Sequence, residues 1–71
     1  MKVWAAEYIT PRHRYWDVFQ TKDAAIRWLE LKAIERGGDS SFMWVKENSE
    51  RYTSQVDFAV FMTVELREVR E

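Results

Sequence analysis

The sequence contains no cysteine, one proline, two glycines and one histidine among its 71 residues. Without cysteine, neither a disulfide nor a thiolate metal site can hold the fold together. The single histidine, His13, stands outside any His-Glu-x-x-His spacing, so a transition metal has few ligands available. We therefore expect no metal and no cofactor, and a fold that depends on packing, including packing against a second subunit.

Patterns typical of catalytic sites are also missing. No Gly-x-Ser-x-Gly segment, glycine-rich phosphate loop or Walker pattern occurs. Glu7 and Asp17 face each other across a predicted hairpin, but such carboxylates are more often solvated surface than an acid/base pair. The sequence predicts a protein that is not an enzyme and works by binding.

Long apolar runs and blocks of one charge are absent as well. No stretch approaches the roughly 20 apolar residues of a membrane span, and the first residues lack the apolar segment of a signal peptide. We therefore expect a soluble, cytoplasmic protein without membrane contact. The net charge of −1 comes from 11 basic and 12 acidic residues that are interspersed. This balance disfavours duplex DNA as a partner, because that affinity requires many neutralised phosphates.

Large side chains are abundant. Four tryptophans, three tyrosines and four phenylalanines contribute to a hydrophobic content of 46%. A domain of this length buries only about 60% of the surface that its unfolded chain exposes, so it needs a core rich in large residues. We interpret residues 1–71 as a single domain.

The first half of the chain predicts a hairpin followed by a helix. Residues 2–10 and 14–20 alternate between polar and apolar, and proline at Thr10-Pro11 ends the first strand. Thr21 offers a capping hydroxyl before a run of good helix formers over 24–36. Gly37-Gly38 ends this helix.

The second half predicts two more strands. Residues 42–45 form a short apolar strand, residues 48–55 are polar and typical of a turn, and residues 56–69 have the period of a long strand. The predicted fold class is α+β, with ββαββ order and a four-stranded antiparallel sheet packed against one helix. A strand order of 2-1-4-3 is the working arrangement.

The helix is expected to turn one apolar arc toward the sheet. At 100° per residue this arc contains Ala25, Ile26, Trp28, Leu29 and Ala33. Lys32 and Arg36 lie on the same arc near the helix end, so their stems must run along the sheet while their charges reach water.

One helix covers only one face of a sheet. Because Glu7 shares a side with Val3 and Ala5, we place Trp4, Ala6 and Tyr8 toward the helix. The helix side then also takes Trp16, Val18 and alternate residues from Val56 to Leu66. The face without a helix is left with Val3, Ala5, Ile9, Tyr15, Phe19, Ala59 and Phe61. Such an apolar face indicates a homodimer or a binding surface for another protein, unless the register is the opposite one.

The predicted hairpin tip, Arg12-His13-Arg14, is basic and is followed by Tyr15 and Trp16. Cations beside aromatic rings can bind a phosphate, an acidic protein surface or an exposed base. A solvated turn that keeps a sheet edge soluble is the alternative interpretation.

Three segments resemble small uncharacterised proteins encoded by bacteriophages. They are the opening Met1-Lys2-Val3-Trp4, the strand-to-helix junction from Phe19 to Ala25, and the amphipathic strand at the end. The resemblance implies an accessory protein that occupies a surface of a host or defence protein. It carries no catalytic residue.

Two functional hypotheses lead, ahead of a minimal enzyme whose polar cluster would have to be assembled near His13 by the fold. The first is a protein-binding module, with a homodimer as one form, that uses Arg12, His13, Arg14, Tyr15, Phe19 and Phe61. The second is binding of single-stranded nucleic acid, with aromatic side chains stacking on bases and Arg12, Arg14 and Arg51 holding phosphates.

Overall fold

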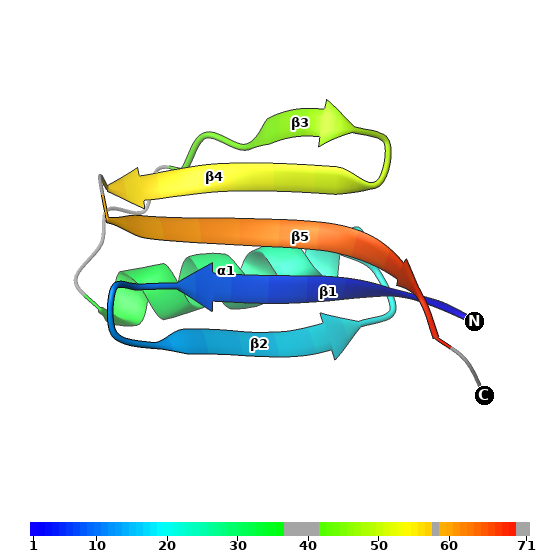
Figure 1. Cartoon of the computed structure of the whole chain (residues 1–71), viewed down its shortest axis with the longest axis horizontal. Coiled ribbons are helices and arrows are strands. Elements are labelled where there is room, and N and C mark those ends of the chain that lie inside the picture. Colours follow the sequence, from blue (N-terminus) through cyan, green and yellow to red (C-terminus); the bar gives the residue numbers. More distant parts are fainter. Residues whose placement is uncertain (37–41, 58, 70–71) are drawn as a thin grey trace.

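The computed structural model describes residues 1–36, 42–57 and 59–69. Its elements are β1 (Lys2–Ile9), β2 (Arg14–Phe19), α1 (Lys22–Glu35), β3 (Val45–Asn48), β4 (Arg51–Asp57) and β5 (Val60–Glu68). The strands form one antiparallel sheet in the order β2-β1-β5-β4-β3. Helix α1 lies behind this sheet in the view of Figure 1. The predicted α+β class is confirmed, whereas the sheet has five strands and not four.

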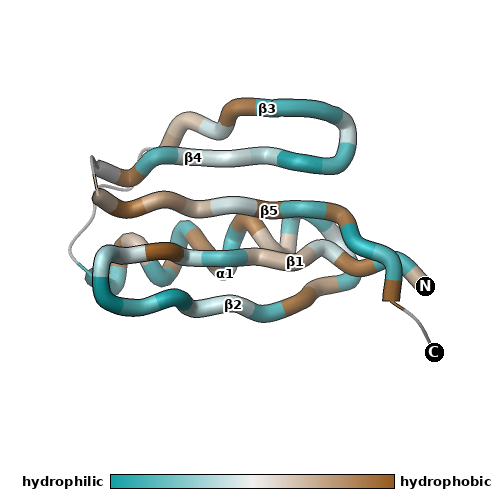
Figure 2. The backbone as a smooth tube through the Cα atoms, viewed as in Figure 1, coloured by the Kyte–Doolittle hydropathy of each residue, from teal (hydrophilic) through white to brown (hydrophobic). Residues whose placement is uncertain are grey.

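The additional strand lies where a turn was predicted. Within the polar segment 48–55 only Ser49 and Glu50 form a turn, and β4 follows directly. Figure 2 shows that β4 is polar or nearly neutral along most of its length. It forms a strand because β3 and β5 pair with it on both sides, and those backbone hydrogen bonds do not depend on apolar side chains.

The predicted long strand over 56–69 is two strands. The chain reverses after Asp57, and Val60 pairs with Asp57 at the start of β5. Residue 58 lies outside the described residues, as do Gly37 and Gly38, the predicted helix stop. The alternation of apolar residues continues through the reversal, so it gave no signal of the turn.

The segment before β3 was also predicted to be a strand, over 42–45. The structure starts β3 at Val45, and Phe42 and Trp44 instead pack beside the core. The indole Nε1 of Trp44 donates a hydrogen bond to Glu30 on α1, at 3.0 Å. This contact ties the chain to the helix before it enters the sheet.

The predicted hairpin and helix start are confirmed. β1 and β2 pair in antiparallel register, and the Thr10 amide and hydroxyl both donate to the His13 carbonyl. The Thr21 hydroxyl accepts from the Ala24 amide at 3.1 Å, which satisfies an N–H group that the first helical turn leaves unpaired.

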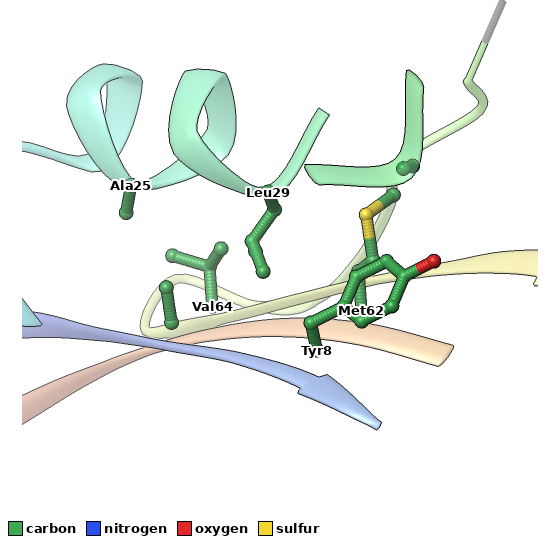
Figure 3. Close-up of a cluster of buried hydrophobic side chains, with 7 residues drawn as sticks. Tyr8, Ala25, Leu29, Met62 and Val64 are labelled. Carbon is green, nitrogen blue, oxygen red and sulfur yellow. The ribbon is translucent and has the colours of Figure 1, made fainter. Parts of the chain in front are cut away.

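The core lies between α1 and the middle of the sheet. The helix buries Ala25, Leu29 and Ala33, as its predicted arc requires, and Figure 3 shows Leu29 directed at the sheet between Val64 and Met62. Alanine at three contact positions, Ala6 on β1 included, allows the helix axis to approach the sheet closely. The cluster consists of Ala6, Tyr8, Ala25, Leu29, Ala33, Met62 and Val64.

Ser54 is an exception in this apolar layer. Its side chain is 3% exposed, and its hydroxyl has no hydrogen-bond partner among the described residues.

Because burial of an unpaired hydroxyl costs free energy, Ser54→Ala is expected to raise the free energy of unfolding by about 1 kcal/mol. Thermal unfolding followed by circular dichroism measures this as a rise in Tm of about 4–8 °C. Thr53→Ala, on the opposite face of β4, is the control. A lower Tm for Ser54→Ala contradicts the prediction.

Candidate functional site

The sheet has one face toward α1 and one without a helix, and the strand register assigns each residue to a face. On β1, Trp4, Ala6 and Tyr8 point toward the helix, as predicted. On β2, however, Tyr15 pairs with Tyr8 and Phe19 pairs with Trp4. Tyr15 and Phe19 therefore lie on the helix side, and their predicted place on the opposite face is wrong.

The predicted helix side of this strand, with Trp16 and Val18, is wrong too, and Asp17 lies on the side that faces the helix. It shares a side with Tyr15 and Phe19, and a carboxylate under a helix is costly. β2 is an edge strand, however, so the exposed Asp17 side chain reaches water past the rim of the sheet. Its Oδ1 accepts the Val18 amide at 2.8 Å, and a charge at an edge also hinders pairing with a foreign strand.

The face without a helix, called the helix-free face below, is turned to the viewer in Figure 1. By the same register it presents Val3, Ala5, Glu7, Ile9, Arg14, Trp16, Val18, Val45, Arg51, Thr53, Gln55, Phe61, Thr63, Glu65 and Arg67. Phe61 lies there as predicted, with Val3, Ala5 and Ile9. Ala59 lies in the turn before β5.

Four of the nine large apolar side chains that are exposed among the described residues lie on the helix-free face. Trp16 is 66% exposed, Val45 55%, Val18 45% and Phe61 43%. Among the described residues, the larger exposed apolar groups of the helix are only Leu31 and Ile34. A sheet face that carries several exposed apolar groups is a candidate contact surface.

Two shallow apolar grooves cross this face. The first is lined by Val3, Ala5, Trp16 and Val18, together with Val69 just beyond β5. The second groove lies on the same face, nearer the edge formed by β3. It is lined by Ile9, Val45, Phe61 and neighbouring polar groups of β4.

A continuous row of ion pairs runs across the face from β2 to β3. Glu7 contacts Arg14 and Arg67, each at 3.5 Å. Glu65 in turn contacts Arg67 at 3.5 Å and also pairs with Arg51. The order along the row is Arg14, Glu7, Arg67, Glu65, Arg51 and Glu47. Positive and negative groups alternate without a break, and the formal charges of the row cancel.

Arg51 is the most firmly held cation of the row. It donates to Glu65 and, at 2.9 Å, to Glu47. The hydrogen bond to Glu65 raises the pKa of Arg51 above its ordinary value, against a smaller opposing effect of burial, and the charge of Glu47 adds to the increase. Arg51 therefore stays charged, with its donors directed at carboxylates of the same sheet.

The predicted basic hairpin tip does not act as one unit. Arg14 belongs to the ion-pair row, whereas Arg12 is exposed at the turn. His13 is exposed, and its ring centroid lies 5.9 Å from that of Tyr15. The tip therefore supplies Arg14 to the helix-free face, whereas the His13 ring lies beside Tyr15.

The helix end places two more cations on Tyr15. Arg36 stacks on the Tyr15 ring at 4.6 Å and donates to its hydroxyl at 2.6 Å. Lys32 Nζ lies 5.2 Å from the same ring and 4.8 Å from that of Trp28. The charged groups of Lys32 and Arg36 thus lie over aromatic rings of the protein, whereas we expected them to reach water. Tyr15 is occupied by contacts within its own chain.

Sequence reasoning missed Trp16, Val18 and Val45 as members of the exposed face, and it missed the ion-pair row. Both sides of β2 carry aromatic groups, so alternation alone does not identify the inner side. The row joins residues from five strands, and the existence of β4 was the missing information. The spacing of Glu65 and Arg67, two residues apart on one strand, was the available sign that both point outward together.

Within residues 1–36, 42–57 and 59–69, no three His, Cys, Asp or Glu side chains gather closely enough to hold a metal ion. In the same part of the chain, no helix combines the length and apolar character needed to cross a membrane.

Comparison of the chain with protein-family models, curated proteins and solved structures found no match. The resemblance to bacteriophage proteins therefore stays a prediction.

Proposed function

We propose that this chain is a non-enzymatic protein-binding module whose contact surface is the helix-free face. The observation that carries the proposal is the exposure of Trp16, Val18 and Phe61 on a face that no other element of the described chain covers. Tryptophan is one of the residues that contribute most to protein interfaces, where it lies near the centre of the contact. Alternating charges beside it supply orientation and selectivity.

The bacteriophage resemblance suggests what such a module does. A small accessory protein of this kind acts by occupying a surface of a host or defence protein, which needs binding residues and no catalytic group. The contact residues proposed from sequence change accordingly. Trp16 and Val18 replace Tyr15 and Phe19, and Arg14 and Phe61 are retained.

Two observations count against single-stranded nucleic acid as the partner. Tyr15 and Phe19, two of the aromatic groups available for stacking, lie on the helix side of the sheet. Arg51, assigned to phosphate, is paired with Glu47 and Glu65. A phosphate would have to displace carboxylates that are already bound, so we favour a protein partner.

Site-specific photo-crosslinking tests the proposal. A photoreactive phenylalanine analogue replaces Val18 on the helix-free face or, as the control, the exposed Arg27 on α1. After irradiation in the native cell extract, we expect discrete protease-sensitive adducts from position 18 and none from position 27. Nuclease-sensitive adducts would support the nucleic-acid alternative. If position 18 gives no protein adduct, the proposed function is wrong.

A further inference from the structure

Strand β2 forms one edge of the sheet, so part of its backbone points away from β1. In an antiparallel pair, residues bonded to the neighbouring strand alternate with residues whose N–H and C=O groups point outward. The Thr10 amide donates to the His13 carbonyl, which makes these two residues a bonded pair. By alternation along the register, the backbone N–H and C=O groups of Arg14, Trp16 and Val18 point outward.

An open edge of this kind is a template for pairing with a strand of another chain. The composition of β2 favours such pairing, because the segment from Tyr15 to Phe19 consists of aromatic and β-branched residues apart from Asp17. Short segments with high strand propensity, little charge and no proline are those that assemble into intermolecular sheets. β2 also pairs in unbroken register with β1 over its six residues, so its outer side is regular.

The opposite edge of the sheet, β3, has features that commonly protect edge strands. It contains only four residues, and its pairing with β4 shifts in register between Lys46 and Asn48. A short strand, an irregular register and charged side chains each hinder an incoming strand. β2 is longer and regular, so its protection has to come from a particular side chain.

Asp17 is placed to give that protection. Its Oδ1 accepts the Val18 amide at 2.8 Å, and this amide is one of the outward donors of β2. A strand that covers Val18 would have to break this hydrogen bond and take the exposed Asp17 carboxylate out of water. Asp17 is also the only charged residue between Tyr15 and Phe19, and a single charge within an apolar strand opposes association.

We propose that Asp17 closes the β2 edge to strand addition by holding the Val18 amide. A partner protein then reaches the sheet through its helix-free face and not by extending the sheet. The inference goes beyond the proposed function and does not depend on it, because it concerns the edge and not the face. When Asp17 is removed from the purified chain, the strand that pairs with the opened edge is β2 of a second copy, since β3 stays short and irregular.

Sedimentation equilibrium of the wild-type chain and of Asp17→Ala tests the proposal. We expect the variant to associate at least about 30-fold more strongly than the wild type, because each of two paired copies regains one backbone donor. Glu35→Ala removes the same charge from an exposed position on α1, and as the control it should leave the association constant unchanged. If Asp17→Ala associates no more strongly than the wild type, the proposal is wrong.

Further variants separate the hydrogen bond from the charge. Asp17→Asn keeps an oxygen acceptor for the Val18 amide and removes the charge, so it should associate like the wild type. In the Asp17→Ala background, Val18→Pro removes the outward donor without breaking a bond to β1, and it should restore the wild-type constant. Val18→Ala in the same background keeps the donor and should not. Association of Asp17→Asn as strong as that of Asp17→Ala contradicts the role of the hydrogen bond.

Amide hydrogen exchange shows where the copies meet. In Asp17→Ala, the amides of Arg14, Trp16 and Val18 should exchange more slowly as the protein concentration rises, whereas the amides of β3 should not change. Protection that increases only outside β2 places the contact on another surface and overturns the proposal. If circular dichroism shows that Asp17→Ala does not fold, Asp17→Val, with a side chain that favours strands, takes its place in each measurement.

Discussion

Leu29→Ala is expected to lower the free energy of unfolding by about 3–5 kcal/mol, the upper part of the range for leucine in a closed core. Leu29 is fully buried between the helix and the sheet, against Met62 and Val64, which are also fully buried. Deleting its side chain removes contacts with both strands and leaves a cavity that the rigid sheet cannot close. A chain of this length is stable by about 4–11 kcal/mol, so the change removes a large part of the total.

The matched control for this prediction is Leu31→Ala. Leu31 lies two residues further along the same helix and is 53% exposed, so the same chemical deletion should change the free energy of unfolding by less than about 0.5 kcal/mol. Urea unfolding followed by tryptophan fluorescence, at one protein concentration for all variants, measures both values. Equal losses at the two positions would show that the helix packs on the sheet through a different side.

Phe19→Ser and Trp16→Ser should have opposite consequences, although both residues are aromatic and lie on β2. The Phe19 ring packs against Trp28 of α1 with centroids 5.6 Å apart. Its loss removes buried apolar area and an aromatic pair, and should cost about 2–3 kcal/mol. Trp16, two thirds exposed on the helix-free face, makes no comparable contact with the helix, so Trp16→Ser should change the stability of the monomer by less than about 0.5 kcal/mol.

Urea unfolding at a concentration where sedimentation shows only monomer measures this difference. The dilution matters because a dimer adds apparent stability that depends on concentration. Circular dichroism detects unfolding here, since Trp16→Ser removes one fluorophore. If Trp16→Ser destabilises the monomer and Phe19→Ser does not, the register of β2 described above is inverted.

Local chemistry made the first half of the chain predictable. Alternation, the Thr10-Pro11 break and the Thr21 cap each act within a few residues, and the structure retains the hairpin and the helix start that they predict. The buried arc of α1 was equally predictable, because the 3.6-residue period of a helix identifies its apolar side without reference to the surface on which it packs.

β4 and the facing of β2 were not predictable in this way. The segment from Arg51 to Gln55 is polar, and it becomes a strand because β3 and β5 both pair with it. The side of β2 that faces the helix depends on the position of Asp17 at the sheet edge, where its carboxylate reaches water. Both outcomes depend on neighbours that are distant in sequence.

By itself, the sequence determined the α+β class, the helix with its buried arc, the first hairpin and an apolar sheet face left without a helix. Only the tertiary structure decided which aromatic groups occupy that face and that six charges from five strands alternate across it. The physical reason is the separation along the chain of the residues that interact. Helix periods, caps and turns are set by neighbours along the chain, whereas strand register and side-chain pairing across a sheet are set by contacts between segments that only folding brings together.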